Sequence, residues 1–220
     1  PLIGASAGQQ LEKASKQPGY ALSLLRILGI SELPESVRKA AAIQFKNFTM
    51  KEWVPEVLAF CVSQLQEKDN IPTEERNQIK GSIVSMMVSS PKPIQSQLSQ
   101  ALSIMSEADF PDKWKQLLPE LVSKMKSQDL NVIHGVLSTL HSVFYKYRTA
   151  MTSNKLLGEI QFVITSDFAP AYLNLFKVKL TAPNLAQMLK TMLLLVKIFY
   201  SLHAQEICEF FEVGFSFCVW

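Results

Sequence analysis

The chain has 220 residues, 48% of them hydrophobic and 10% aromatic, a composition that indicates a globular protein and excludes a disordered one. The formal net charge of +3 comes from 22 basic and 19 acidic residues. This excess is too small and too dispersed to indicate a nucleic-acid-binding protein. Only 8 glycines are present, few for a β-rich or α/β protein, so we expect helices to dominate.

The cysteines and the start of the chain bear on its context. Cys61, Cys208 and Cys218 are odd in number and contain no C-x-x-C pair, so neither a disulfide framework nor a metal pair is expected, and a reducing compartment is favoured. The chain begins at Pro1 without a methionine or a signal-peptide pattern. We therefore expect it to be a fragment of a longer protein.

The first segments of the chain have helical patterns. Residues 3–16 predict a weakly amphipathic helix, residues 20–28 an apolar helix that ends at Gly29, and residues 35–51 a third helix. The third helix has apolar residues at helical spacing, which predict one buried face: Val37, Ala41, Phe45 and Phe48. Residues 54–70 are less regular and predict a short helix or an ordered insertion.

The middle of the chain continues the pattern. Thr73 is expected to cap a helix that runs to about Val88, and Ser89-Ser90-Pro91 separates it from a helix over 94–105. The hinge 109–114 precedes an apolar pattern over 114–125, in which Pro119 implies a kink or a late helix start.

Asp129 is expected to cap a helix over 131–147. Residues 156–180 predict a helix bent at Pro170, and residues 185–202 predict a further one, followed by a terminal piece over 206–220. Lys190 and Lys197 interrupt the most apolar stretch, so we expect a buried helix and no membrane insertion.

These elements predict an all-α fold. About nine or ten helices alternate with short polar or proline-containing hinges, and no segment has the two-residue alternation of a strand. Helical-hairpin repeats of about 40–47 residues fit this organisation. We predict one array over 1–220, a right-handed superhelical solenoid of HEAT-like antiparallel helix pairs with about five repeats, the first and last incomplete.

The sequence gives no positive support for catalysis, a cofactor or a metal site. His134 and His141 are seven residues apart, without the i, i+4 partner or nearby thiolate that a metal would need, and His203 is remote from both in the sequence. Nucleophile-elbow and phosphate-loop motifs are absent. Basic residues recur near Lys39, Lys51 and Arg148, where either an ordinary solvated face or a site for an acidic protein partner is possible.

Several motifs resemble one known family. The run Ala40 to Phe48 with Trp53 is similar to the N-terminal motif of importin-β-type transport receptors (karyopherins). The hinge Asp109 to Trp114 with Leu117 to Leu121 is similar to that family's F-P-x-x-W-x-x-L-L-P-x-L element. Three more segments, 87–91, 132–137 and 197–202, narrow the resemblance to the exportin branch that returns importin-α to the cytoplasm.

The resemblance covers about residue 5 to Glu212, with a poor fit over 54–70, and places an importin-β N-terminal-like region within about 1–90. It implies a nuclear-transport receptor that shuttles between nucleus and cytoplasm, binds Ran-GTP and, at full length, exports importin-α. The Ran-binding surface would lie on the second helix of each pair. The residues that the resemblance implicates there are Lys39, Lys46, Asn47, Lys51, Gln97, Ser103, Asn131, His134 and Lys146.

Four aromatic residues are assigned to packing instead: Phe45, Trp53, Phe110 and Trp114. Two other functions remain open. A generic HEAT-repeat scaffold with a different protein partner would have second helices on a featureless convex face. An all-α enzyme would need a deep pocket with convergent carboxylates or histidines.

Overall fold

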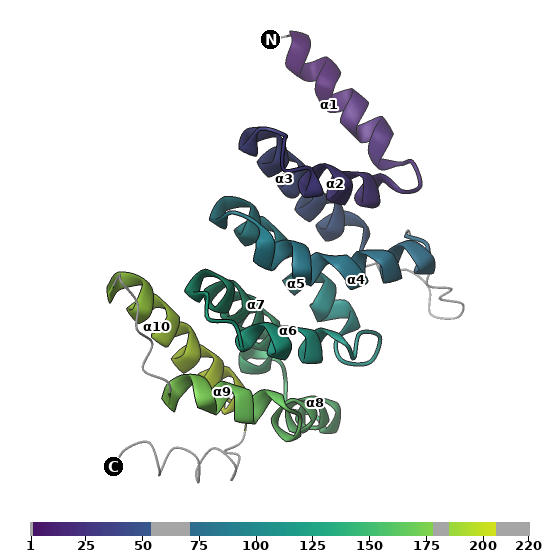
Figure 1. Ribbon diagram of the computed structural model, residues 1–220. Helices are drawn as coiled ribbons and strands as arrows, with labels where there is room; N and C mark the ends of the chain where they lie inside the picture. Colours follow the sequence, from purple (N-terminus) through teal and green to yellow (C-terminus); the bar gives the residue numbers. More distant parts are fainter. Residues whose placement is uncertain (1, 54–70, 178–184, 206–220) are drawn as a thin grey trace, which may run out of the picture. The chain divides into compact units, whose positions relative to one another are not determined.

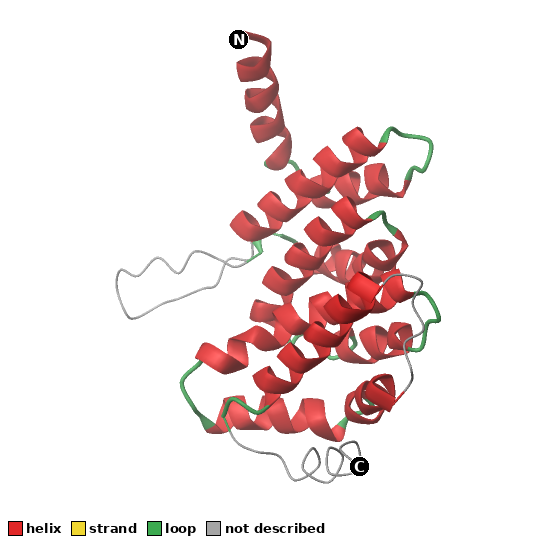
Figure 2. Ribbon diagram, turned by 90° about the vertical axis from the view of Figure 1, so that its left-hand side faces the viewer, coloured by secondary structure: helices red, strands yellow, loops and turns green. Residues whose placement is uncertain are grey.

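A computed structural model describes residues 2–53, 71–177 and 185–205 of the chain (Figure 1). The predictions for 54–70, for the end of the 156–180 segment and for 206–220 lie outside these residues. The described part forms ten helices and no strand (Figure 2), as the sequence predicts for an all-α solenoid of helix pairs. It divides into two compact units, residues 1–108 and 109–220.

The helices of the first unit begin and end close to the predicted residues. Their bounds are α1 (Leu2–Ser15), α2 (Tyr20–Gly29), α3 (Glu35–Glu52), α4 (Thr73–Ser89) and α5 (Lys92–Asp109). The N-cap of α4 is Pro72, so the expectation that Thr73 caps this helix is wrong. Pro72 has an extended ψ of 141° and no N–H to satisfy, which suits the residue before a helix.

Helices α2 and α3 form an antiparallel pair. Arg38 Nε, near the start of α3, donates to the Leu28 carbonyl at the end of α2 (3.0 Å). The rings of Tyr20 and Phe48 meet at the other end of the pair, with centroids 5.4 Å apart. The buried residues of α3 are Ala41, Ala42, Phe45 and Thr49.

The predicted buried face of α3 is wrong at its edge. Val37 is 45% exposed, and Phe48 is half-buried. Both lie on the side of the helix toward Lys51, about a quarter turn from the centre of the buried residues. The local period was therefore right, but the face that packs is rotated relative to the one expected.

Polar side chains hold α4 against the earlier elements. The N–H of Gly19, whose φ of 80° is left-handed, donates to Glu75 Oε2 (3.1 Å). Arg76 Nη2 donates to the carbonyl of Trp53 (2.9 Å), and its guanidinium lies 4.7 Å from the centre of that ring. Glu75 and Arg76 are buried although charged, because each has such a partner.

The second unit contains α6 (Leu117–Met125), α7 (Leu130–Thr149), α8 (Asn154–Thr165), α9 (Phe168–Lys177) and α10 (Leu185–Leu202). Pro119 lies in the first turn of α6, which confirms the late helix start. Asp129 caps α7 as predicted, because its side chain accepts from the N–H of Asn131 (2.8 Å). The hinge before α6 has a cis peptide bond at Phe110–Pro111.

The helix predicted over 156–180 is instead two helices, and the bend is not at Pro170. The break is at Ser166, whose Oγ accepts from the N–H of Phe168 (3.2 Å). Pro170 lies in the first turn of α9, where a missing N–H removes no helical hydrogen bond. The bounds of α10 are those expected.

Helices α7 and α10 lie side by side and run in the same direction. Gln187 Nε2 donates to Asn131 Oδ1 near the start of both helices (3.0 Å). Arg148 Nε donates to Ser201 Oγ near their ends (2.9 Å), and its Nη2 donates to the Lys197 carbonyl. The expectation that α10 is a buried helix is wrong, because only 28% of it is buried. Its length and mean hydropathy of 1.4 would allow it to cross a membrane, and its buried face packs here on other helices of the unit.

Candidate protein-binding surface

The nine residues that the resemblance implicates lie on three helices. Four are on α3, two on α5 and three on α7. The first six belong to the first unit and the last three to the second.

The four residues of α3 share one side of the helix. Lys39, Asn47 and Lys51 are exposed and Lys46 is half-buried, all turned away from the buried Phe45. Lys39 and Lys46, seven residues apart, form one edge, and Asn47 and Lys51, four apart, form the other. We call these four residues the α3 face.

The α3 face is positively charged, and Glu52 beside it carries the opposite charge. Lys51 Nζ lies 3.7 Å from Glu52 Oε1, and the Lys51 side chain is 69% exposed. An ion pair of this length on an exposed side chain is weak, about 0–1 kcal/mol. Lys51 can therefore exchange Glu52 for a carboxylate on a partner at little cost.

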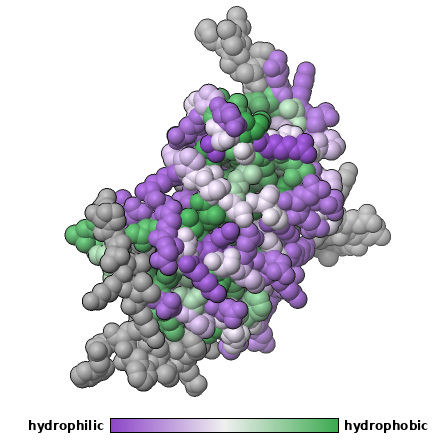
Figure 3. All heavy atoms as spheres, in the orientation of Figure 1, coloured by the Kyte–Doolittle hydropathy of each residue, from purple (hydrophilic) through white to green (hydrophobic). Residues whose placement is uncertain are grey.

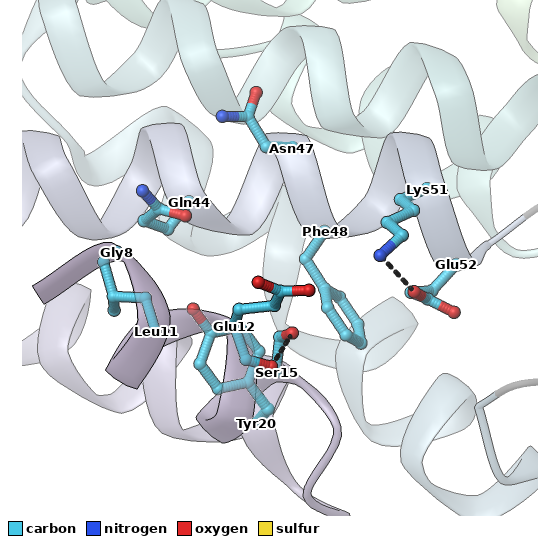
Figure 4. Close-up of a pocket in the computed structure, with 10 residues that line it drawn as sticks. All are labelled: Gly8, Leu11, Glu12, Ser15, Tyr20, Gln44, Asn47, Phe48, Lys51 and Glu52. Carbon is cyan, nitrogen blue, oxygen red and sulfur yellow. Dashed lines mark hydrogen bonds and ion pairs between the residues drawn. The ribbon is translucent and has the colours of Figure 1, made fainter. Parts of the chain in front are cut away.

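A groove opens beside the α3 face, with a volume of about 270 Å³. Helices α1, α2 and α3 all contribute to its lining, shown in Figure 4: Gly8, Leu11, Glu12, Ser15, Tyr20, Gln44, Asn47, Phe48, Lys51 and Glu52. Glu12, Tyr20 and Phe48 point toward one another, whereas Asn47 points away from them. The groove thus has an apolar floor with acidic and amide groups at its rim.

The tyrosine in this groove is a hydrogen-bond donor. Burial raises the pKa of Tyr20 above its usual 10.0, so the phenol stays protonated near neutral pH. It can donate a hydrogen bond to a partner. The groove combines donors, acceptors and apolar area, which suits recognition of a protein surface.

The two residues of α5 do not form a common site. Gln97 and Ser103 are both half-buried, and they lie on opposite edges of the exposed side of the helix. The apolar residues predicted for this helix are buried: Ile94, Leu98, Ala101, Leu102 and Met105.

The three residues of α7 have structural contacts within the second unit. Asn131 accepts from Gln187 on α10, and the half-buried His134 also has an interaction within the chain. Lys146 Nζ lies 2.7 Å from Glu159 Oε2 of α8 and donates to the Phe110 carbonyl (3.3 Å). Lys146 is therefore committed to holding α7, α8 and the hinge together, which makes the α3 face the better candidate.

The aromatic residues assigned to packing are all buried: Phe45, Trp53, Phe110 and Trp114. The sequence reasoning did not single out the groove residues Glu12, Gln44 and Glu52. No local spacing could have indicated them, because the groove forms only when α1 comes against the α2–α3 pair. Among the described residues, no group of three or more His, Cys, Asp or Glu side chains could hold a metal ion.

Comparisons with known proteins identify two matching families. Residues 7–89 match the importin-beta N-terminal domain and residues 143–218 match Cse1. The second match passes Glu212, so the expectation that the resemblance ends there is wrong. The chain is 36% identical to exportin-2 of Drosophila melanogaster over 219 residues and 38% identical to exportin-2 of Homo sapiens over 221 residues.

Each alignment covers 96% of this chain and 22% of the relative, so the chain spans about a fifth of the curated relatives' length. Among solved structures, the exportin Cse1 in its cargo-free, cytoplasmic state matches 99% of the chain and 24% of its own, with a TM-score of 0.83 at 32% identity. Lph2, a bidirectional nuclear transport receptor of S. cerevisiae, has the same fold (TM-score 0.68, 23% identity, 89% of this chain and 19% of that one). Cse1 is described as an exportin and Lph2 as a nuclear transport receptor.

Proposed function

The chain belongs to the importin-β superfamily, in its exportin-2 branch, and on that premise we propose that it forms the part of a nuclear-export receptor that binds Ran-GTP. The observation that supports a site is the α3 face, Lys39, Lys46, Asn47 and Lys51, beside a groove that three helices line. Its lysines can pair with carboxylates of Ran, and Asn47 can satisfy exposed backbone groups.

The proposed action requires no chemistry on GTP. Nucleotide state would be sensed through the switch loops of Ran, which the γ-phosphate orders. A receptor surface that fits the ordered loops binds the GTP form more tightly, and the preference equals the difference between its binding free energies for the two states. The cargo of the whole receptor would be importin-α, and the receptor would shuttle between nucleus and cytoplasm.

The binding claim is tested with this chain and Ran locked in either nucleotide state. We expect weak binding, with the GTP form preferred, because a full receptor of this family grips its partners with repeats beyond these. The double variant Lys46→Glu, Lys51→Glu should weaken Ran-GTP binding at least ~10-fold, since it places carboxylates opposite those of the partner.

The matched control reverses the charge of two lysines that lie outside the α3 face. Lys13→Glu with Lys92→Glu changes the net charge by the same amount on α1 and the first residue of α5. It should change the affinity less than ~2-fold at physiological salt, where distant surface charges are screened. Equal binding of the GTP and GDP forms would contradict nucleotide sensing. Equal effects of the two double variants would show that the binding site is not on the α3 face.

The importin-α claim needs a longer receptor. Exchanging this chain for the matching region of human exportin-2 tests whether these repeats support a complex with importin-α and Ran-GTP. We expect the chimera to form that complex and to lose it with Lys46→Glu, Lys51→Glu. A folded chimera that binds Ran-GTP but never importin-α would contradict the cargo claim alone.

A further inference from the structure

Helices α7 and α10 together form a surface without acidic residues. They lie side by side, and neither contains an aspartate or a glutamate. Lys146 of α7 is paired with Glu159 of α8. Among the described residues, the arginine and the two lysines that remain on the two helices have no carboxylate partner: Arg148, Lys190 and Lys197. The pair of helices therefore carries positive charge that the described part of the chain does not neutralise.

Arg148 lies between two exposed tyrosine rings. Its guanidinium carbon is 5.4 Å from the centre of the Tyr145 ring on α7 and 4.7 Å from the centre of the Tyr200 ring on α10. Tyr145 is 50% exposed and Tyr200 is 61% exposed. Arginine and tyrosine are enriched at the centres of protein interfaces, where a few such residues supply most of the binding free energy. Two exposed rings around one guanidinium thus indicate a surface for a protein partner.

The guanidinium of Arg148 is fixed in place and still has donors to offer. Nε donates to Ser201 Oγ, and Nη2 donates to the Lys197 carbonyl. Nη1 has no acceptor among the residues that the structure describes. A side chain that is already held in one rotamer loses little conformational entropy when it binds a partner. Arg148 is therefore preorganised to donate to an acceptor outside the chain.

His141 and Lys197 complete this surface. His141, Tyr145 and Arg148 recur at intervals of four and three residues on α7, so they share one side of that helix. The rings of His141 and Tyr145 have centroids 6.2 Å apart. After burial, the charges of Arg148 and Lys197 are the next causes of the lowered pKa of His141, so both cations act on its imidazole. We call His141, Tyr145, Arg148, Lys197 and Tyr200 the α7–α10 site.

The surroundings of the α7–α10 site define the ligand that fits it. Lys190 is about two helical turns from Lys197 on the same side of α10, about 10 Å along the axis. Leu193 and Val196, both exposed, lie on the same helix. In Figure 3 apolar side chains reach the surface near the left-hand edge, where Figure 1 places α10. A matching ligand carries anionic groups about 10 Å apart, with apolar groups beside them.

We propose that the α7–α10 site binds an acidic segment of a partner protein. One carboxylate of the segment accepts from the remaining N–H groups of Arg148, because a planar carboxylate matches the guanidinium fork. The rings of Tyr145 and Tyr200 exclude water around this pair, which strengthens the attraction. A second carboxylate pairs with Lys190. In an extended segment of the polyproline II type, every third side chain faces the same way, about 9 Å from the last, which matches the spacing of the cations.

The charge of the chain favours a protein segment over a nucleic acid. Tyrosine rings and an arginine can also stack on unpaired bases. A nucleic acid, however, binds through many phosphate contacts, and the formal net charge of the chain is only +3. The inference does not rest on the Ran proposal, because all its residues lie in the second unit and the α3 face lies in the first.

The test measures binding of a fluorescein-labelled acidic peptide to the whole chain by fluorescence anisotropy. The probe has glutamate at every third position and leucine or serine between. Its control has glutamine in place of each glutamate. We expect the acidic peptide to bind at low salt at least ~10-fold more tightly than the control, and its affinity to fall as salt rises. Equal binding of the two peptides would overturn the proposal.

A lysine reversal tests where the peptide binds. Lys197→Glu should weaken binding of the acidic peptide at least ~10-fold, since it places a carboxylate beside those of the peptide. The matched control is Lys126→Glu, which changes an exposed lysine between α6 and α7. The start of α7 is about 27 Å along the helix axis from Arg148, so screening should keep this effect below ~2-fold. Equal effects of the two reversals would exclude the α7–α10 site.

Two paired substitutions test the tyrosine rings. Tyr145→Phe with Tyr200→Phe keeps both rings beside Arg148 and should change the affinity less than ~3-fold. Tyr145→Leu with Tyr200→Leu removes the rings and should weaken binding at least ~10-fold, with unchanged helicity in circular dichroism because both positions are exposed. If the leucine pair binds the acidic peptide as tightly as the phenylalanine pair, the rings take no part in binding and the proposal fails.

The imidazole of His141 gives a readout that a purely structural role would not move. A bound carboxylate offsets the charges of Arg148 and Lys197, so the pKa of His141 should rise toward 6.5 in the saturated complex with the acidic peptide. Titration by NMR, with His134 and His203 as internal references, measures this change. An unchanged pKa of His141 in the saturated complex would show that the peptide binds elsewhere.

Two further measurements separate this site from other partners and from the α3 face. Single-stranded oligothymidine that binds more tightly than the acidic peptide, and is lost with Lys197→Glu, would assign the site to a nucleic acid and overturn the proposal. The double variant Lys46→Glu, Lys51→Glu should leave binding of the acidic peptide unchanged. A loss of binding in that variant would place the peptide on the α3 face instead.

Discussion

Arg148 on α7 and Ser201 on α10 are joined by a hydrogen bond of 2.9 Å, although 53 residues separate them in sequence. The guanidinium also donates to the Lys197 carbonyl and lies 4.7 Å from the centre of the Tyr200 ring. The Arg148 side chain thus contacts three residues of a neighbouring helix. Its N–H groups donate two hydrogen bonds, and its planar, charged guanidinium contacts the Tyr200 ring.

Removing this side chain should destabilise the second unit. Arg148→Ala is expected to lower the free energy of unfolding by about 1–3 kcal/mol, because it removes two charge-assisted hydrogen bonds and a cation–π contact. Arg148→Lys should recover less than half of the loss, since an ammonium cannot reproduce the fork. The control Arg26→Ala changes an exposed arginine of α2, and urea unfolding should show a much smaller effect.

Lys146 and Lys155 of the second unit form ion pairs that should differ strongly in strength. Lys146→Ala leaves Glu159, whose side chain is 11% exposed, without its cation and is expected to cost about 2–4 kcal/mol. Lys155→Ala removes the pair with Asp112 at 3.2 Å, in which both side chains are at least 70% exposed, and should cost less than about 0.5 kcal/mol. Comparable unfolding midpoints for both variants would contradict the structural assignment of Lys146.

Substituting two glycines with alanine should change the stability in opposite directions. Gly19→Ala is expected to destabilise by about 1 kcal/mol or more, because its φ of 80° is left-handed and its N–H must reach Glu75. Gly8→Ala lies in α1 with nothing near the added Cβ, so helix propensity should stabilise by up to about 1 kcal/mol. Thermal unfolding should move in opposite directions for the two variants, and a rise in melting temperature for Gly19→Ala would contradict the turn geometry.

His141 should give the stability a dependence on pH. Burial, then the charges of Arg148 and Lys197, lower its pKa below the usual 6.5. The unfolded chain then binds more protons than the folded one, so stability falls as pH drops through 6.5 toward the lower folded pKa. Above pH 6.5 the imidazole of His141 is neutral in both the folded and the unfolded chain, so it adds no pH dependence to the stability there. His141→Gln should flatten the difference in unfolding free energy between pH 7 and 5, and an unchanged slope would assign it to other groups.

Sequence reasoning predicted most of the helices, because their apolar periods and punctuation are local. The bounds of α10 and the cap at Asp129 are examples. It misplaced the break between α8 and α9 because a proline in a first turn and one that bends a helix have the same local sequence. What separates them is Ser166, whose side chain can cap the next helix.

The candidate surface was harder to predict for a different reason. A sequence shows which residues share a helical face, and so it placed the four residues of the α3 face together. It does not show which polar residues are used within the fold. Lys146 and Asn131 are taken by Glu159 and Gln187, and the latter partner is 56 residues away in the chain.

Many of the bonds that join helices here end on backbone carbonyls. Arg38 donates to Leu28, Arg76 to Trp53, Tyr172 to Leu195, and Gln205 to Tyr147 and Ala150. Every residue has a backbone carbonyl. Such a bond therefore requires a particular side chain at the donor position but none at the acceptor position. The donor and the acceptor of each such bond should therefore differ in their tolerance to substitution. Gln205 and Arg148, which donate, should resist replacement, whereas Ala150 and Lys197, which accept through the backbone, should accept many side chains without loss of the bond. An assembly joined in this way can diverge widely in sequence and still keep the register of its helices.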